Sequence, residues 1–280
     1  MTTRNAFLRQ AFLGIWLAAG TAWAQSPAAA PPTNPSILRL STTTSTENSG
    51  LLKALLPAFE QATGLKVQVI SVGTGKALEL AKNGDVDVTL VHARASEDKF
   101  VLDGFGVNRR DVMYNDFIIV GPEQDPAGIR GRQDVLAALR TITERGARFV
   151  SRGDNSGTDQ MEQSYWQQVG SKPAGKAYIS AGLGMGEVLN MAAELQAYTL
   201  TDRATYAAYR ARTGLAVLVQ GDARLFNPYG IIAVNPARHG GVNYTGAMKL
   251  IEWMTSPEGQ KRIAAFQIGG QQLFFPHAKP

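Results

Sequence analysis

The sequence contains no cysteine and only three histidines, His92, His239 and His277. Without cysteine the chain has no disulfide, no thiolate nucleophile, no iron–sulfur cluster and no cysteine-bound zinc. The histidines are far apart in the sequence, which gives little support to an imidazole metal centre. We therefore expect no metal site and no cofactor.

Charged residues are also few, at 18% of the 280 residues, whereas 44% of the residues are hydrophobic. Such a composition can form a buried core and is unlike that of disordered chains. The length suits one large domain or two lobes of about 100–150 residues each. The formal charge is only +5 and no dense stretch of Lys and Arg is present, so we expect no nucleic-acid partner.

The N-terminal segment has the pattern of a secretory signal peptide. Arg4 and Arg9 stand beside an apolar stretch at 11–19, and the letters AWA at 22–24 fit a cleavage site. The apolar stretch is too short to cross a bilayer, which needs about 20 residues. We expect residues 1–24 to be removed, which leaves a soluble periplasmic protein with no cysteine for a lipid anchor.

Strands and helices are predicted to alternate from residue 37 onward. The predicted elements are strands at 37–40, 66–71 and 86–91, with helices at 51–61 and 76–82 between them. Strand–helix–strand at this spacing indicates parallel βαβ units. A second set of similar elements follows residue 120, which indicates a second α/β lobe.

Two extended stretches, at 111–120 and 229–234, are placed to lead into this second set and back. We therefore predict an α/β fold of two lobes, each a mainly parallel sheet flanked by helices, joined by a two-segment hinge. The predicted division is a signal peptide at 1–24, a disordered proline-rich linker at 25–36, lobe I at 37–115 and 226–280, and lobe II at 116–225.

Three turns rich in hydroxyls follow predicted strands directly: STTTST at 41–46, SVGTGK at 71–76 and SRGDNSGT at 151–158. Ligands of open parallel sheets bind at the carboxyl ends of strands, where helix N-termini present free amides. Ser or Thr before a helix is also an ordinary N-cap, and a single such turn would be interpreted that way. Three of them together favour a cage for an oxyanion.

Arg152 in the third turn adds a permanent cation with forked donors suited to an oxyanion. The alternative is a surface ion pair with Asp154 or Glu162. We expect Asp154 to orient Arg152 and not to contact the ligand. An enzyme acting on phosphate or sulfate esters through Arg152 and Ser156 is a weaker hypothesis, because no base or metal cluster accompanies these turns. We expect a binding protein and not an enzyme.

Several longer blocks carry a resemblance to a known family. They are TTTST at 42–46, VGTGKAL at 72–78, DVTLVHA at 87–93, GVNRRDVMYNDFIIVGP at 106–122, SRGDNSGT at 151–158, AYTLTDRATY at 197–206, LFNPYGIIAVNP at 225–236 and QLFFP at 272–276. The chain resembles the tungstate-binding proteins of bacterial ABC uptake systems, which are periplasmic substrate-binding proteins with the two-lobed type II fold. One departure is Asp159, where histidine usually follows the SGT triplet of the family.

The resemblance implies that a receptor captures tungstate between closing lobes and delivers it to a membrane permease of an ABC importer. We expect a monomer, because a receptor that must open and close is usually monomeric. Molybdate is a further possible ligand, and a molybdate or phosphate receptor of the same fold is the alternative. The residues it implies for the oxyanion site are Thr43, Thr44, Ser45, Ser71, Thr74, Arg152, Ser156, Gly157 and Thr158.

Overall fold

The computed structural model describes residues 36–278, all within the compact unit Pro32–Pro280. The predicted signal peptide at 1–24 and all but the last residue of the predicted linker at 25–36 lie outside the described residues. Within 36–278, every helix is too short or too polar to span a membrane.

Parallel strands form the first lobe, as the βαβ spacing predicts. Strand β1 (Ile37–Thr43) pairs in parallel with β2 (Lys66–Val72) on one side and with β3 (Val88–Val91) on the other. The helices that follow these strands are α1 (Thr44–Asn48), α2 (Leu51–Thr63), α3 (Thr74–Asn83) and α4 (Arg94–Leu102). The carboxyl ends of β1, β2 and β3 therefore meet at one edge of the sheet.

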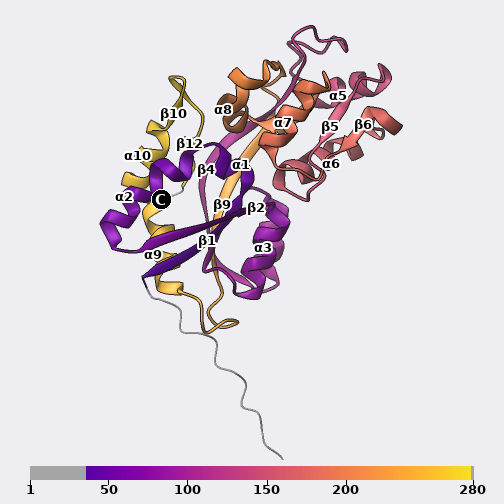
Figure 1. Cartoon of the computed structure of the whole chain (residues 1–280). Helices are drawn as coiled ribbons and strands as arrows, with labels where there is room; N and C mark the ends of the chain where they lie inside the picture. Colours follow the sequence, from indigo (N-terminus) through magenta and orange to yellow (C-terminus); the bar gives the residue numbers. More distant parts are fainter. Residues whose placement is uncertain (1–35, 279–280) are drawn as a thin grey trace, which may run out of the picture. The chain divides into compact units, whose positions relative to one another are not determined.

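Two long strands, β4 (Gly106–Gly121) and β9 (Phe226–Val234), run through the middle of the molecule in antiparallel register (Figure 1). Strand β9 also pairs antiparallel with β3, and the second half of β4 pairs antiparallel with β7 (Thr199–Asp202) and β8 (Ala216–Val219). The sheet is thus mixed, whereas we predicted mainly parallel sheets. The reason is that strands leading out of a lobe and back into it run in opposite directions. The predicted lobe boundaries at 115/116 and 225/226 fall in or beside these strands and stay a prediction.

The second lobe contains the elements between β4 and β9. They are α5 (Val135–Glu144), β5 (Phe149–Ser151), α6 (Gly157–Val169), η1 (Gly175–Ala177), β6 (Tyr178–Ser180), α7 (Met185–Glu194), β7, α8 (Arg203–Thr213), β8 and η2 (Ala223–Leu225). After β9 the chain forms α9 (Tyr244–Thr255), α10 (Pro257–Ala265), β10 (Gln267–Ile268), β11 (Gln271–Gln272) and β12 (Phe275–Pro276). Strand β12 pairs with β4, and α9 and α10 pack in the first lobe (Figure 1).

Alternating side chains of the long strands pack into cores on opposite faces. On β9, Ile231 and Ala233 pack with the residues of α2, α9 and α10, whereas Ile232 and Val234 pack with those of α3 and α4. The second half of β4 does the same in the second lobe, with alternate residues packing toward α5 and α6 or toward α7. This period of two is what buries both faces of a strand. Each lobe is consequently a sheet covered by helices on both sides.

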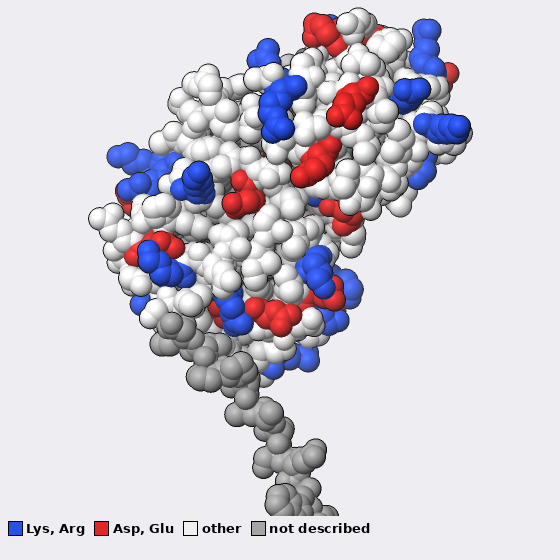
Figure 2. Space-filling view, viewed as in Figure 1, with Lys and Arg blue, Asp and Glu red and all other residues white. Residues whose placement is uncertain are grey.

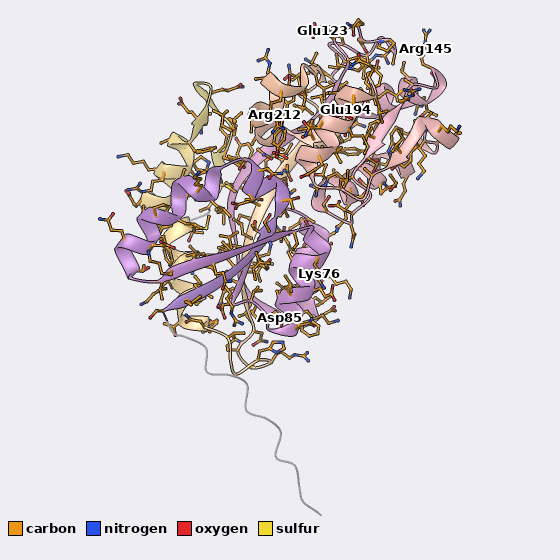
Figure 3. All side chains as sticks on the ribbon, in the orientation of Figure 1. Lys76, Asp85, Glu123, Arg145, Glu194 and Arg212 are labelled. Atoms are coloured by element: carbon orange, nitrogen blue, oxygen red, sulfur yellow. The ribbon has the colours of Figure 1, made fainter. Side chains whose placement is uncertain are left out.

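Charged side chains of both signs are interspersed over the face drawn in Figure 2. Figure 3 labels Lys76 of α3 and Asp85 after it on the first lobe, and Glu194 of α7 and Arg212 of α8 on the second. On the part of this face that the structure describes, no large patch of a single sign gathers.

Candidate oxyanion site

The turn after β1 forms a compact group of buried hydroxyls. Thr43 caps α1, and its Oγ1 accepts the amide of Thr46 at 3.2 Å. The same oxygen lies 3.0 Å from Oγ of Ser45 and 2.7 Å from Oγ1 of Thr46. The ordinary N-cap interpretation thus holds for Thr43. An N-cap needs only one side-chain oxygen, however. The hydroxyl groups of Ser45 and Thr46 are therefore more than capping of this helix requires.

Arg152 follows β5 and joins the third turn to the first. Its Nη2 donates to Oδ2 of Asp154 at 2.5 Å and to Oγ1 of Thr44 at 3.0 Å. The prediction that Asp154 orients Arg152 is confirmed by this ion pair. The arginine side chain is only 1% exposed, so the alternative of a surface ion pair is wrong.

Three buried donors in and beside the third turn have no hydrogen-bond partner among the residues that the structure describes. They are Nε and Nη1 of Arg152 and Oγ1 of Thr158. A buried donor without a partner costs about 1–3 kcal/mol, and more when the group is charged. Hydrogen bonds from a guanidinium to an oxyanion are charge-assisted and strong, and Nε and Nη1 of Arg152 are two such donors. These atoms therefore fit an anion with several acceptor oxygens.

The turn after β2 meets the third turn directly. Oγ1 of Thr74 accepts the amide of Gly157 at 2.9 Å, and the amide of Gly75 donates to the carbonyl of Asn155 at 3.3 Å. Thr74 is fully buried. Because Thr74 acts here as an acceptor, its own hydroxyl proton stays available for another partner. All three predicted turns are thus joined by hydrogen bonds.

Ser156 and Ser71 differ in how they relate to this group. Ser156 is the N-cap of α6, where its Oγ accepts the amide of Asp159 at 3.2 Å, and it is fully buried. Ser71 is half-buried in β2, in register with Thr42 of β1. Within residues 36–278 the Ser71 hydroxyl makes no hydrogen bond, and Ser71 lies within β2 and not in the turn that follows it.

Asp159, the residue that departs from the family pattern, supports the third turn from behind. Its Oδ2 accepts the amide of Asn155 at 2.9 Å, and its Oδ1 accepts from Gln163 Nε2 at 3.1 Å. The carboxylate is therefore already hydrogen-bonded to the turn backbone and to α6. An acid in the first turn of a helix is also favourable toward the helix dipole.

His92 is a buried polar residue that we did not include in the predicted site. It follows β3, is 3% exposed, and its Nε2 lies 3.1 Å from both Thr43 Oγ1 and Ser45 Oγ. Its Nδ1 lies 3.0 Å from Oδ1 of Asn227, and its ring stacks on Tyr229. Burial, and then the charge of Arg152, lower the pKa of His92 to about 4, so the imidazole is neutral at neutral pH. Its position at the end of a buried strand was the available sequence signal.

Asp202 and Thr205 bring a second-lobe helix to the first turn, and the sequence prediction also missed them. Asp202 caps α8 by accepting the amide of Thr205 at 2.8 Å, and Thr205 Oγ1 donates to the carbonyl of Ser45 at 3.2 Å. Burial raises the pKa of Asp202, although the nearby charge of Arg152 acts in the opposite direction. The site thus includes contributions from α8 as well as from the three predicted turns.

One arrangement in the site resembles a nucleophile with its base. Ser45 contacts His92, which is held in turn by Asn227. A general base works best when its pKa lies near the operating pH, and the pKa of His92 is about 4. Its Nε2 is also shared with Thr43. The site is therefore suited to holding an anion and poorly suited to activating a nucleophile.

Residues 26–258 match the family model of the PBP superfamily domain. The chain belongs to the PBP superfamily. A curated relative, the tungstate-binding protein TupA of Peptoclostridium acidaminophilum, is 48% identical over 243 residues, which are 85% of this chain and 85% of the relative. The name of this relative is that of a binding protein and not of an enzyme, in agreement with the expected binding role.

Two solved structures are similar to this superfamily member along most of its length. The crystal structure of the tungstate ABC transporter from Geobacter sulfurreducens is 57% identical, covers 82% of this chain and 98% of that chain, and has a TM-score of 0.77. The tungstate-binding protein TupA from Desulfovibrio alaskensis G20 is 48% identical, covers 87% and 99% of the two chains, and has a TM-score of 0.74. The predicted two-lobed type II fold is confirmed.

Proposed function

We propose that this protein captures tungstate between its two lobes and delivers it to the membrane permease of an ABC importer. The observation that carries the proposal is the buried guanidinium of Arg152, with two nitrogens unpartnered within residues 36–278 beside hydroxyls from both lobes. Removing a dianion from water is tolerable only when nearly all of its oxygens find donors. The names of the relatives support tungstate as the anion.

The state of Asp154 supports a fully deprotonated anion. Hydrogen phosphate carries a proton and is favoured by an acceptor in the cage, whereas tungstate and molybdate require donors alone. Asp154 accepts from Arg152 with one oxygen and from the amide of Ser156, at 3.2 Å, with the other. It is thus engaged within the protein. The nine predicted residues remain our proposed site, with Ser71 the least supported.

A phosphate receptor is the second candidate, and one observation favours it. Oδ2 of Asp202 is buried with no partner among the described residues, and in the ionised carboxylate this oxygen can accept a hydrogen bond from the proton of hydrogen phosphate. Burial raises the pKa of Asp202, which favours the protonated carboxyl and so reduces this capacity.

Competition calorimetry with tungstate, molybdate, phosphate and sulfate tests the proposal. We expect tungstate to bind tightly and to prevent the heat signal of phosphate at equal concentration. Native mass spectrometry of protein purified from cells should show a monomer that retains one tungstate. Tight phosphate binding that tungstate does not displace would instead establish the phosphate receptor.

We also propose that the protein acts in the periplasm after removal of residues 1–24. The basic start, the short apolar stretch and the AWA at 22–24 support this. Intact-mass measurement of the exported protein should give a chain that begins at Gln25. A periplasmic chain that keeps its first residues would contradict the cleavage site.

A further inference from the structure

A buried chain of hydrogen bonds crosses the two long strands and ends at the hydroxyls of the first turn. Asn115 of β4 and Asn227 of β9 face each other in register, and Nδ2 of Asn227 donates to Oδ1 of Asn115 at 2.6 Å. Oδ1 of Asn227 lies 3.0 Å from Nδ1 of His92. These three side chains are at most 3% exposed. These direct side-chain hydrogen bonds therefore connect β4 and β9 to the hydroxyls of the site.

The direction of this chain determines which nitrogen of His92 carries the proton. Because the Asn227 amide group donates to Asn115, its carbonyl oxygen faces His92 and can only accept. Nδ1 of His92 must then be the donor. In a neutral imidazole the other nitrogen, Nε2, has a lone pair and acts as an acceptor.

Nε2 has one lone pair but two hydroxyl neighbours. Oγ1 of Thr43 and Oγ of Ser45 both lie 3.1 Å from it, so only one of the two hydroxyl protons can be directed at the ring. The oxygen of Thr43 already accepts the amide of Thr46. The remaining hydroxyl proton can be donated to a neighbouring hydroxyl, since Oγ1 of Thr43 lies 3.0 Å from Oγ of Ser45 and 2.7 Å from Oγ1 of Thr46, or to an anion oxygen when one is bound.

We propose that His92 is a positioning residue of the oxyanion site, which orients the Thr43 and Ser45 hydroxyls through Nε2 so that the pair offers a proton to the anion. The inference rests on the proposed function. A neutral acceptor suits this place because Arg152 already supplies the cation of the site. The same ring lies close to the third turn, since a Cβ added at Gly157 would lie 2.9 Å from Nδ1 of His92.

The substitutions His92→Gln and His92→Phe test separately the two roles of the side chain, as a hydrogen-bond acceptor and as a packed ring. Both remove the bond to Asn227, but glutamine can present its amide oxygen near the place of Nε2, whereas phenylalanine offers no acceptor and keeps a ring against Tyr229. We expect His92→Phe to weaken tungstate binding about tenfold or more, and His92→Gln to stay within about threefold of wild type. The control is His239→Gln, because His239 Nε2 contacts the carbonyl of Lys82 instead.

Nitrogen-15 NMR of the histidine rings of the ligand-free protein tests the orientation independently of any anion. We expect the His92 signals of a ring protonated at Nδ1 and unprotonated at Nε2 at neutral pH. A proton on Nε2, or equal losses of tungstate affinity in the two His92 variants, would overturn the proposal. If wild-type protein binds none of the anions, the proposed function fails and the positioning role fails with it. The NMR result still shows in that case which nitrogen of His92 donates in the hydrogen-bond series from Asn115 to His92.

Discussion

Replacing Arg152 with alanine should weaken tungstate binding by about 2–5 kcal/mol, which is roughly 30- to 4,000-fold in Kd. The variant loses the only arginine among the proposed site residues, and with it the two guanidinium nitrogens that have no partner among the described residues. It also leaves Asp154 without its cation, because Nη2 of Arg152 is the group that pairs with this carboxylate. An unpaired negative charge beside the bound anion adds repulsion to the loss of attraction.

Isothermal calorimetry of Arg152→Ala and Arg152→Lys measures this effect. Lysine keeps the charge but not the fork, so we expect an intermediate affinity. Arg262→Ala is a suitable control, because Arg262 forms an exposed pair with Glu258 within α10. Equal affinity of wild type and Arg152→Ala would remove Arg152 from the site and with it the main support for an oxyanion receptor.

Gly157→Ala should weaken tungstate binding by about 1–3 kcal/mol, or roughly 5- to 150-fold, without destabilising either lobe. A Cβ at Gly157 would lie 2.7 Å from the backbone oxygen of His92, so the start of α6 in the second lobe could not approach the end of β3 in the first. Gly157 is helical, which alanine also favours. The substitution therefore acts against closure and not against folding.

Small-angle scattering with calorimetry and thermal melting distinguishes these effects. Wild-type protein should contract when tungstate is added, whereas Gly157→Ala should contract less and need more tungstate, with Tm unchanged or raised. Gly240→Ala is the matched control, since no atom lies within 4 Å of a Cβ added there. A Gly157→Ala protein that closes and binds like wild type would show that these backbones need not approach so closely.

The parts of the site that the sequence predicted are those set by local order along the chain. A hydroxyl-rich turn after a buried strand can be recognised in the sequence, and parallel βαβ units bring such turns to the same edge of the sheet. Asp154 was predictable as the partner of Arg152 because it is two residues away. Ser71 shows the limit of this reasoning, because it was expected in the turn but lies within β2, in register with Thr42 of β1.

The parts that the sequence did not predict depend on pairings between distant segments. His92 is held by Asn227, which is 135 residues away, and that contact exists because β9 pairs antiparallel with β3. The βαβ spacing says nothing about a returning antiparallel strand. Helix α8 was also missed, because three arginines interrupt its apolar residues, and the contact of Thr205 with Ser45 spans 160 residues.

Strand β4 belongs to both lobes, with Val112 and Met113 in the core of the first and residues 117–120 in the cores of the second. Melting one lobe would strip a strand from the sheet of the other, so neither half has an independent denaturation equilibrium. The protein should behave on heating as a single cooperative unit, even though the proposed capture of an anion requires its halves to move as two bodies.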